Sequence, residues 1–249
     1  FMVISPSIYD LMITLALVFN ILFIVLNYRK YNLKFRDVIL LLLIENIFIV
    51  LGGKFFTFLD EFPKYGFKEI LDLWFTSYGN MIGAFIGIIV YSLIFKKDMT
   101  ALLTLGGLPL PMVYAIGKIG CFTAGCCYGI NYAGFGKVIY TSSNQAPLNV
   151  SLFPIQLVEA LIFVGIFFYF YHKCEKKRKT NSLSLNDTFY LLIAISISKF
   201  GLDYLRSSSN NAFLSFNQKI SIVLFIVSIL GLGYSHVKEK KKDINKNRS

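Results

Sequence analysis

The stretch Gly117-Lys118-Ile119-Gly120-Cys121-Phe122-Thr123-Ala124-Gly125-Cys126-Cys127-Tyr128-Gly129 ends a long apolar segment in the middle of the chain. It contains four glycines, three cysteines and one lysine. Glycine permits tight backbone turns and the close approach of a ligand or a second helix. A lysine at the end of an apolar segment is costly unless it is paired, solvated or functional. The other unusual residues of the chain can be placed relative to this stretch.

The composition of the chain is typical of a polytopic membrane protein. Its 249 residues are 55% hydrophobic, and its mean hydropathy of +0.61 is well above that of soluble domains. The formal net charge is +11, which in a soluble protein would suggest nucleic acid as a partner. Here the basic residues cluster between apolar segments, so we expect contact with anionic membrane lipid and no nucleic-acid partner.

Apolar length predicts an all-α, polytopic membrane bundle of about seven transmembrane helices. The first segment lacks the basic region and cleavage site of a signal peptide, so we expect it to remain as a span. We expect a single integral-membrane domain over residues 1–249, with a basic cytoplasmic tail over about 236–249. The predicted spans are about Ser7–Leu26, Val38–Thr57, Tyr78–Phe95, Ala101–Phe122, Pro154–Tyr171, Thr188–Leu205 and Lys219–Tyr234.

The basic residues predict the orientation of these spans. In a seven-span arrangement most lysines and arginines fall on one side, after the first, third, fifth and seventh spans. The positive-inside rule places that side in the cytoplasm. The N-terminus is therefore expected outside and the C-terminus in the cytoplasm.

Two connections on the outer side are longer and more varied than simple links. Residues 58–77 mix aromatic and acidic side chains, which predicts an interfacial amphipathic segment anchored among lipid headgroups. Residues 131–152 form a polar connection that is long for a helical bundle, and connections of this length are commonly functional or mobile.

Ionisable residues inside the spans are candidate functional groups, because each costs about 2.5–3.5 kcal/mol at a helix centre. The structural alternative is that acids and bases pair between helices and lock the bundle. Lys199, Asp203 and Arg206 are spaced to share one face of the sixth span, near its outer end, which suits contact with a phosphate headgroup. The full set is Asp10, Glu45, Lys54, Lys118, Glu159, Lys199, Asp203 and Arg206.

Two other spans show polar or small residues at helical spacing. Gln156 and Glu159 give the fifth span a polar face. Glycine recurs at every fourth position over residues 79–87 in the third span, a pattern typical of close helix packing. Tyr78 and Asn80 stand at the mouth of that span as candidate polar groups of a site.

The cysteines allow several interpretations. Cys121, Cys126 and Cys127 cluster in the central stretch and Cys174 stands apart, without the framework of a secreted disulfide protein. A metal site is disfavoured because both histidines lie far away, on the predicted cytoplasmic side, so we expect no metal and no cofactor. An outer-side disulfide and a nucleophilic thiolate assisted by Lys118 stay open, but packing of a small side chain in a crowded turn is favoured.

The central stretch resembles the signature of bacterial prolipoprotein diacylglyceryl transferases, Gly-Arg-Ile-Gly-Asn-Phe-x-Asn-Gly-Glu followed by an aromatic residue and Gly. Five other landmarks resemble motifs of that family and occur in the family's order, so the resemblance covers most of the chain. They are Tyr9-Asp10-Leu11-Met12, Gly53-Lys54-Phe55-Phe56, Tyr78-Gly79-Asn80, Phe153-Pro154-Ile155-Gln156-Leu157-Val158-Glu159 and Lys199-Phe200-Gly201-Leu202-Asp203-Tyr204-Leu205-Arg206.

The resemblance implies a transferase of the bacterial cell (inner) membrane that acts in lipoprotein biosynthesis. Its reaction moves diacylglycerol from phosphatidylglycerol to the thiol of a lipobox cysteine in a prolipoprotein. Its partners would be phosphatidylglycerol, the lipobox peptide and membrane lipid. The residues implied for headgroup binding are Lys118, Lys199, Arg206, Gln156, Glu159, Tyr9 and Lys54, and those implied for catalysis are Lys118, Tyr78, Cys121, Cys126 and Asp203.

The chain departs from the family pattern at several of these positions. Tyr78 stands in place of the family's His, and Cys121 and Cys126 stand in place of the signature Asn and Glu. Lysine replaces arginine at positions 54, 118 and 199, which keeps the charge but loses bidentate phosphate geometry. Two alternatives therefore stay open. One is a non-catalytic or altered-acceptor glycerolipid-binding or transport protein on the same scaffold, and the other is a thiol redox or metal protein.

Overall fold

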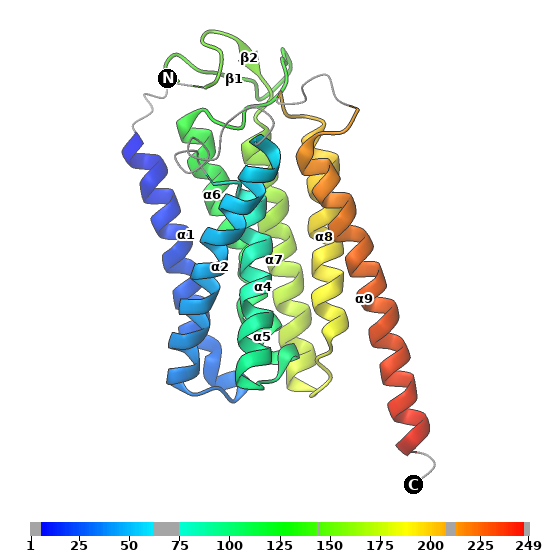
Figure 1. The fold of residues 1–249 in the computed structure, drawn as a ribbon. Helices are drawn as coiled ribbons and strands as arrows, with labels where there is room; N and C mark the ends of the chain where they lie inside the picture. Colours follow the sequence, from blue (N-terminus) through cyan, green and yellow to red (C-terminus); the bar gives the residue numbers. More distant parts are fainter. Residues whose placement is uncertain (1–5, 62–74, 144, 208–212, 247–249) are drawn as a thin grey trace.

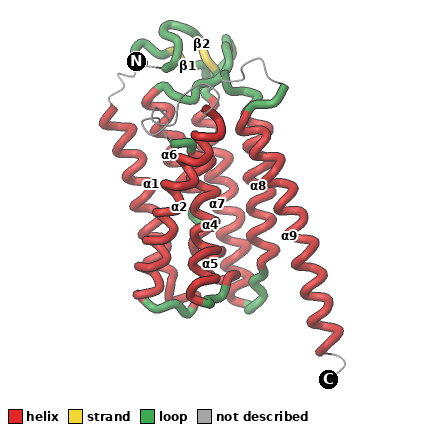
Figure 2. The backbone as a smooth tube through the Cα atoms, viewed as in Figure 1, coloured by secondary structure: helices red, strands yellow, loops and turns green. Residues whose placement is uncertain are grey.

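The computed structural model describes residues 6–61, 75–143, 145–207 and 213–246 of the chain. Long helices stand side by side in one bundle, and a small cap of loops and two short strands covers one end (Figures 1 and 2). The elements in chain order are α1 (Pro6–Asn27), η1 (Tyr28–Tyr31), α2 (Phe35–Glu61), α4 (Ser77–Phe95), α5 (Met99–Gly107), α6 (Leu110–Ala124), β1 (Val138–Ile139), β2 (Ser151–Leu152), α7 (Ile155–Lys179), α8 (Leu185–Asp203) and α9 (Phe216–Lys246).

The predicted polytopic helical architecture is confirmed. Within the described residues, six helical segments are long and apolar enough to cross a membrane. The predicted spans fall on α1, α2, α4, α7 and α9, and α7 and α9 continue past their apolar parts as basic helices. The six segments are Ile8–Tyr31, Phe35–Glu61, Ser77–Phe95, Met99–Ala124, Ile155–Lys179 and Phe216–Val237.

The fourth predicted span is not the single continuous helix that apolar length indicated. α5 ends at Gly107 and α6 begins at Leu110, with a turn that contains Pro109 between them. Proline has no N–H to donate and its ring crowds the preceding turn, so it interrupts a helix. The two helices together still have the length and composition of one span, Met99–Ala124.

α8 corresponds to the sixth predicted span, but it is less apolar than the six segments above. It carries Asp187, Lys199 and Asp203 within 19 residues. All three are buried, as is Ser196, so the polar face predicted to avoid lipid points into the bundle. The helix packs between α7 and α9 (Figure 1), which explains how a charged helix fits among apolar ones.

The glycines at 79–87 bring α4 into backbone contact with α2. A Cβ added at Gly79 would lie 2.7 Å from the carbonyl oxygen of Gly52. A Cβ added at Gly83 would collide with the carbonyl oxygen of Phe48. Only glycine permits backbones to approach this closely, so the predicted packing role of these glycines is confirmed.

The two ends of the bundle differ in charge. The α1–α2, α4–α5 and α7–α8 connections and the C-terminal part of α9 lie at the end opposite the cap (Figure 1). The structure therefore groups the basic segments on which the predicted orientation rests. The basic residues in these connections and in the helix ends that flank them are Arg29, Lys30, Lys34, Arg36, Lys96, Lys97, Lys173, Lys176, Lys177, Arg178 and Lys179.

The connection at residues 131–152 forms the cap. β1 and β2 pair antiparallel, and Tyr140, Ala146 and Leu152 make a small buried core. The hydroxyl of Tyr140 donates to the carbonyl oxygen of Phe122 (3.1 Å), which ties the cap to the end of α6. Burial raises the pKa of Tyr140 to about 12, so the phenol stays a neutral donor at physiological pH.

The interfacial segment predicted at residues 58–77 falls mostly on residues 62–74, which lie outside the described residues. Its first part, up to Glu61, continues α2, and Thr76 is the N-cap of α4. The anchoring of this segment among headgroups therefore stays a prediction.

We predict that Gly83→Ala destabilises the bundle, because the added methyl group must separate α2 from α4. Overpacking of this kind costs about 1–3 kcal/mol, and it would appear as a lower midpoint of unfolding in detergent. Gly165→Ala is the matched control, since Gly165 lies in α7 and a Cβ there meets no described atom within 4 Å. Equal midpoints for the two variants would contradict the close packing described here.

Candidate active site

The C-terminal end of α6 turns the cysteine stretch back on itself. Gly125 caps the helix in the left-handed conformation (φ 66°), and the N–H of Cys126 donates to the carbonyl oxygen of Cys121 (3.1 Å). Cys127 also has a positive φ of 53°, which is uncommon for a residue with a side chain. These two left-handed residues reverse the chain and return Cys126 and Cys127 towards Cys121.

The reversal gathers three thiols. The sulfur atoms of Cys121, Cys126 and Cys127 all lie within 4.8 Å of one another, and all three cysteines are free. Hydrogen bonds with the other two thiols lower the pKa of Cys127 well below its ordinary value, and the charges of Lys118 and Arg206 lower it further against the opposing effect of burial.

A buried ion cluster lies beside these thiols. The carboxylate of Glu159 in α7 forms an ion pair with Lys118 in α6, whose Nζ lies 2.7 Å away, and accepts a hydrogen bond from Nζ of Lys199 in α8 at 2.9 Å. The hydroxyl of Tyr114 accepts from Lys199 at 2.7 Å and donates to Glu159 at 3.3 Å. All four residues are buried, so this ion cluster joins three helices inside the bundle.

The ion cluster carries an excess of positive charge. Two ammonium groups face one carboxylate, and both also lie near the face of Tyr114, with Nζ of Lys118 and Lys199 5.2 and 5.1 Å from the ring centroid. Contact with an aromatic face offsets part of the desolvation of a cation. In a low-dielectric interior, the remaining charge attracts an anion strongly.

Arg206 approaches from the end of α8, where the chain is joined to the cysteine stretch. Gly129 and Arg206 form an isolated antiparallel bridge, and the N–H of Ser207 donates to the carbonyl oxygen of Tyr128 (3.1 Å). The side chain of Arg206 is 11% exposed, and its Nη1 lies 3.5 Å from Oδ1 of Asp203. Its Nε has no hydrogen-bond partner among the residues that the structure describes.

Asp203 connects α8 to the start of α9. Ser215 donates its hydroxyl to one carboxylate oxygen, and Nδ2 of Asn217 donates to the other at 3.4 Å. Asp203 contacts Arg206, whereas Lys199, on the same helix face, contacts Glu159 instead.

Gln156 supports the cysteine turn from α7. Its Nε2 donates to the carbonyl oxygen of Cys126 at 2.8 Å and to the hydroxyl of Tyr140 at 3.4 Å. The side chain is 1% exposed. The structure thus places Gln156 where it holds the turn and the cap together, next to the site rather than in the ion cluster.

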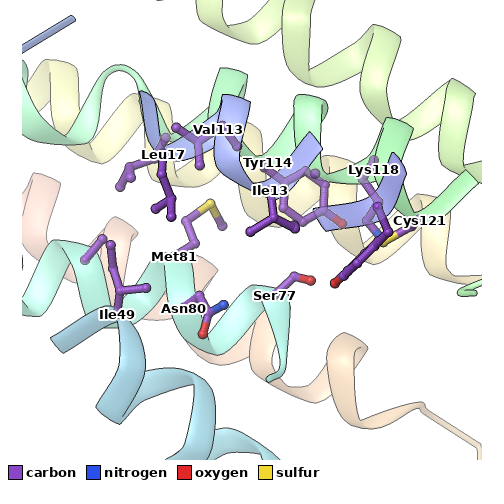
Figure 3. Close-up of a pocket in the computed structure, with 15 residues that line it drawn as sticks. Ile13, Leu17, Ile49, Ser77, Asn80, Met81, Val113, Tyr114, Lys118 and Cys121 are labelled. Atoms are coloured by element: carbon purple, nitrogen blue, oxygen red, sulfur yellow. The ribbon is translucent and has the colours of Figure 1, made fainter. Parts of the chain in front are cut away.

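A cavity of about 130 Å³ lies between α1, α2, α4 and α6. Figure 3 shows Leu17, Ile49 and Met81 towards one end of this cavity and Lys118 and Cys121 towards the other. α1 packs on α6 and α2 packs on α4, so the cavity separates two helix pairs. Apolar side chains predominate at the first end, where the amide of Asn80 lies beside Ile49 and Met81, and the charged and thiol groups lie at the other, a division that suits an amphipathic ligand.

The remaining predicted site residues fall in three places. Tyr9 lines the cavity from α1. Tyr78 is 2% exposed, and its ring centroid lies 5.8 Å from Nζ of Lys199, so it is an interior residue rather than a group at the mouth. Lys54 stands over the ring of Phe75, with Nζ 4.6 Å from the centroid, a contact outside the ion cluster.

Tyr114 is the member of the ion cluster that the sequence did not reveal. It precedes Lys118 by four residues, so the two share a helix face. That spacing was the available signal. A tyrosine in an apolar segment is more commonly part of a core, and only the arrival of Lys199 from α8 distinguishes this one.

The family model described as prolipoprotein diacylglyceryl transferase matches residues 2–234 of the chain. The chain belongs to this family. Its relatives are transferases that act in lipoprotein biosynthesis. The family resemblance of the central stretch is therefore confirmed.

Several curated relatives are named phosphatidylglycerol–prolipoprotein diacylglyceryl transferase. Enzyme 2 of Clostridium perfringens is 31% identical over 204 residues, which cover 78% of this chain and 77% of that protein. A Dehalococcoides mccartyi enzyme is 29% identical over 174 residues, with 68% and 65% covered. A Clostridium tetani enzyme is 31% identical over 160 residues, which cover 62% of this chain and 61% of that protein. The alignments with the Dehalococcoides mccartyi and Clostridium tetani enzymes therefore span less than two thirds of those proteins.

We predict that Glu159→Gln destabilises the protein by about 3–5 kcal/mol, because it leaves two buried ammonium groups without a counter-charge. The measurement is the free energy of unfolding in detergent. Glu159→Gln combined with Lys199→Gln restores the original net charge of the ion cluster and should recover part of this loss.

The matched control for this prediction is Glu175→Gln, the same change in the same helix. Glu175 is paired with Arg178 near the basic end, and its side chain is 19% exposed. A pair of this kind contributes about 1 kcal/mol or less. Losses of similar size for Glu159→Gln and Glu175→Gln would contradict the central role of Glu159.

Proposed function

We propose that this protein transfers diacylglycerol from phosphatidylglycerol to the cysteine thiol of a prolipoprotein lipobox. The names of its relatives state this activity for those proteins. The observation that carries the proposal is a buried, positively charged ion cluster at the polar end of a cavity whose other end is apolar.

The excess charge would bind the phosphate of the lipid headgroup. Lys118 and Lys199 share the single carboxylate of Glu159, and Nε of Arg206 lacks a partner among the described residues. Lysine and arginine donate charge-assisted hydrogen bonds to phosphate oxygens. The same cations would stabilise the negative charge that grows on the phosphate as it leaves.

The acyl chains would occupy the apolar end of the cavity. Leu17, Ile49 and Met81 line that end. Leu17 belongs to the apolar helix α1 and is 40% exposed, so it contacts both the cavity and the surface of the bundle. Because α1 and α2 pack on different partners, a lipid could enter between them from the bilayer and present its headgroup to Lys118.

In the proposed reaction the lipobox sulfur forms a bond to the glyceryl carbon. The bond from that carbon to the phosphate oxygen breaks, and glycerol phosphate leaves with the electron pair. The proton of the thiol must pass to a base before or during the attack. The side chains carry out binding, orientation and charge stabilisation, and the choice of base is the step at which this chain departs from the family pattern.

One observation favours a second candidate function. The family's His position holds Tyr78, and among the described residues that line the cavity none is a histidine or a carboxylate. A glycerolipid-binding protein without catalysis, or one with another acceptor, would need no such base. Lipid that co-purifies and is never turned over would favour that candidate, and any transferred product would reject it.

We further propose that the protein resides in the bacterial inner membrane with its cap end outside. The support is that the basic connections gather at the opposite end of the bundle, which the positive-inside rule assigns to the cytoplasm. The ion cluster and the cysteines would then lie in the outer half of the protein, where exported prolipoproteins arrive.

We predict that Arg206→Gln lowers the transfer of labelled diacylglycerol to a lipobox peptide by about 100-fold, because a phosphate-stabilising cation is lost. Lys118→Met should have an effect of similar size. Arg29→Gln is the matched control, since Arg29 is an exposed arginine at the opposite end. Transfer at the wild-type rate in both Arg206→Gln and Lys118→Met would refute the headgroup role of the ion cluster.

The orientation is tested by labelling introduced cysteines in intact cells with a membrane-impermeant thiol reagent. Phe135→Cys in the cap, where the native side chain is fully exposed, should react in intact cells. Lys30→Cys at the basic end should react only after permeabilisation, and the wild-type chain gives the background of its own cysteines. The reverse pattern would overturn the proposed orientation.

A further inference from the structure

Three thiols at one turn are more than packing requires. A small side chain suits each position separately, but size does not explain why Cys121, Cys126 and Cys127 place their sulfur atoms within 4.8 Å of one another. Both histidines lie far from this turn in the sequence, but the fold brings together a donor set that contains no histidine. Convergent thiolates are the ligands of thiophilic ions such as Zn²⁺.

The spacing of the sulfur atoms suits a tetrahedral ion. Zinc–sulfur bonds of about 2.3 Å place two sulfur ligands about 3.8 Å apart in a tetrahedron. Separations of up to 4.8 Å reach that value through small rotations of the side chains. Three thiolates fill three positions and leave a fourth open, which is the arrangement of catalytic rather than structural zinc.

The surroundings hold these sulfur atoms in place. Cys121 is buried in the last turns of α6, and Gln156 fixes the backbone carbonyl of Cys126 at 2.8 Å. The positive φ of Cys127 sets the direction of the third side chain. Interactions of neighbouring groups with the ligand residues orient the ligands of a metal site and tune its affinity.

The local charge also suits a trithiolate site. Three thiolates and one divalent cation carry a net charge of −1. Lys118 lines the same cavity as Cys121, Arg206 is bridged to Gly129 just after the cysteines, and both side chains are largely buried, at 3% and 11% exposed. The negative charge of the occupied site would therefore be compensated without solvent.

We propose that Cys121, Cys126 and Cys127 bind a thiophilic divalent cation such as Zn²⁺, whose fourth position takes the thiol of the lipobox cysteine. The binding of the ion stands on the geometry of the sulfur atoms, and the role of the fourth position rests on the proposed transfer reaction. Cys121 and Lys118 line the polar end of the lipid cavity. A thiol held beside them would meet the lipid at its headgroup.

Metal binding would supply the activation for which the family pattern uses other residues. A thiol that coordinates a divalent metal loses its proton, here to solvent. The thiolate sulfur then bonds to the glyceryl carbon while the carbon–oxygen bond breaks and glycerol phosphate leaves with the electron pair. The proton released by the thiol balances the one that the phosphate or solvent takes up, and no oxidant or reductant is needed.

The first test is Co²⁺ binding by the full-length protein in detergent. We expect one equivalent of Co²⁺ with sulfur-to-cobalt charge-transfer absorption and tetrahedral d–d bands, both displaced by Zn²⁺. Cys126→Ser and Cys127→Ser should lose this absorption, whereas the matched control Cys174→Ser, at a buried cysteine of α7, should keep it. Absence of the bands in the wild type, or bands unchanged in both cysteine variants, would overturn the site.

The second test is transfer of labelled diacylglycerol to a lipobox peptide after chelation. We expect the rate to fall at least about 100-fold and to return with Zn²⁺, since activation of the nucleophile contributes this much or more. Transfer that survives both chelation and Cys127→Ser would retain the proposed function and overturn metal activation. Cobalt–thiolate bands without transfer under any condition would retain the metal site and reject diacylglyceryl transfer.

Discussion

The interior of the bundle depends on the single carboxylate of Glu159. It is fully buried and lies 2.7 Å from Lys118 and 2.9 Å from Lys199. Without it, two ammonium groups would face each other in a medium that solvates neither. Because the three side chains come from α7, α6 and α8, the same ion pairs fix the relative positions of these helices and the positions of the candidate headgroup ligands. Stability and chemistry therefore share one constraint.

Much of the fold could be predicted from the sequence because apolar length and charge are strong, local signals. The inward direction of the polar face of α8 followed from the spacing of Lys199 and Asp203, since charged groups avoid lipid. The close contact of α2 and α4 followed from the glycines at 79–87. The turn at Pro109 was missed because apolar length does not detect a short turn inside an apolar segment. α5 and α6 together retain the length and composition of one span.

The candidate site was harder to predict because it depends on contacts between distant segments. The charged members of the ion cluster were recognisable as costly residues in apolar spans. The pairing of Glu159 with both lysines was not, because spacing along one helix does not determine which helix lies opposite. The convergence of the cysteines was hidden for a related reason. It results from two left-handed residues, Gly125 and Cys127, and a positive φ at a cysteine leaves no trace in the sequence.

At Cys127 the residue that would be most stable in the observed backbone conformation differs from the residue that completes the thiol cluster. A side chain in the left-handed conformation costs about 1–2 kcal/mol, whereas glycine adopts it freely. A chain selected for stability alone would carry glycine here and would lose one member of the thiol cluster. The protein thus keeps a cysteine where the backbone conformation favours glycine. Such a loss of stability in favour of a functional side chain is expected at a strained functional site.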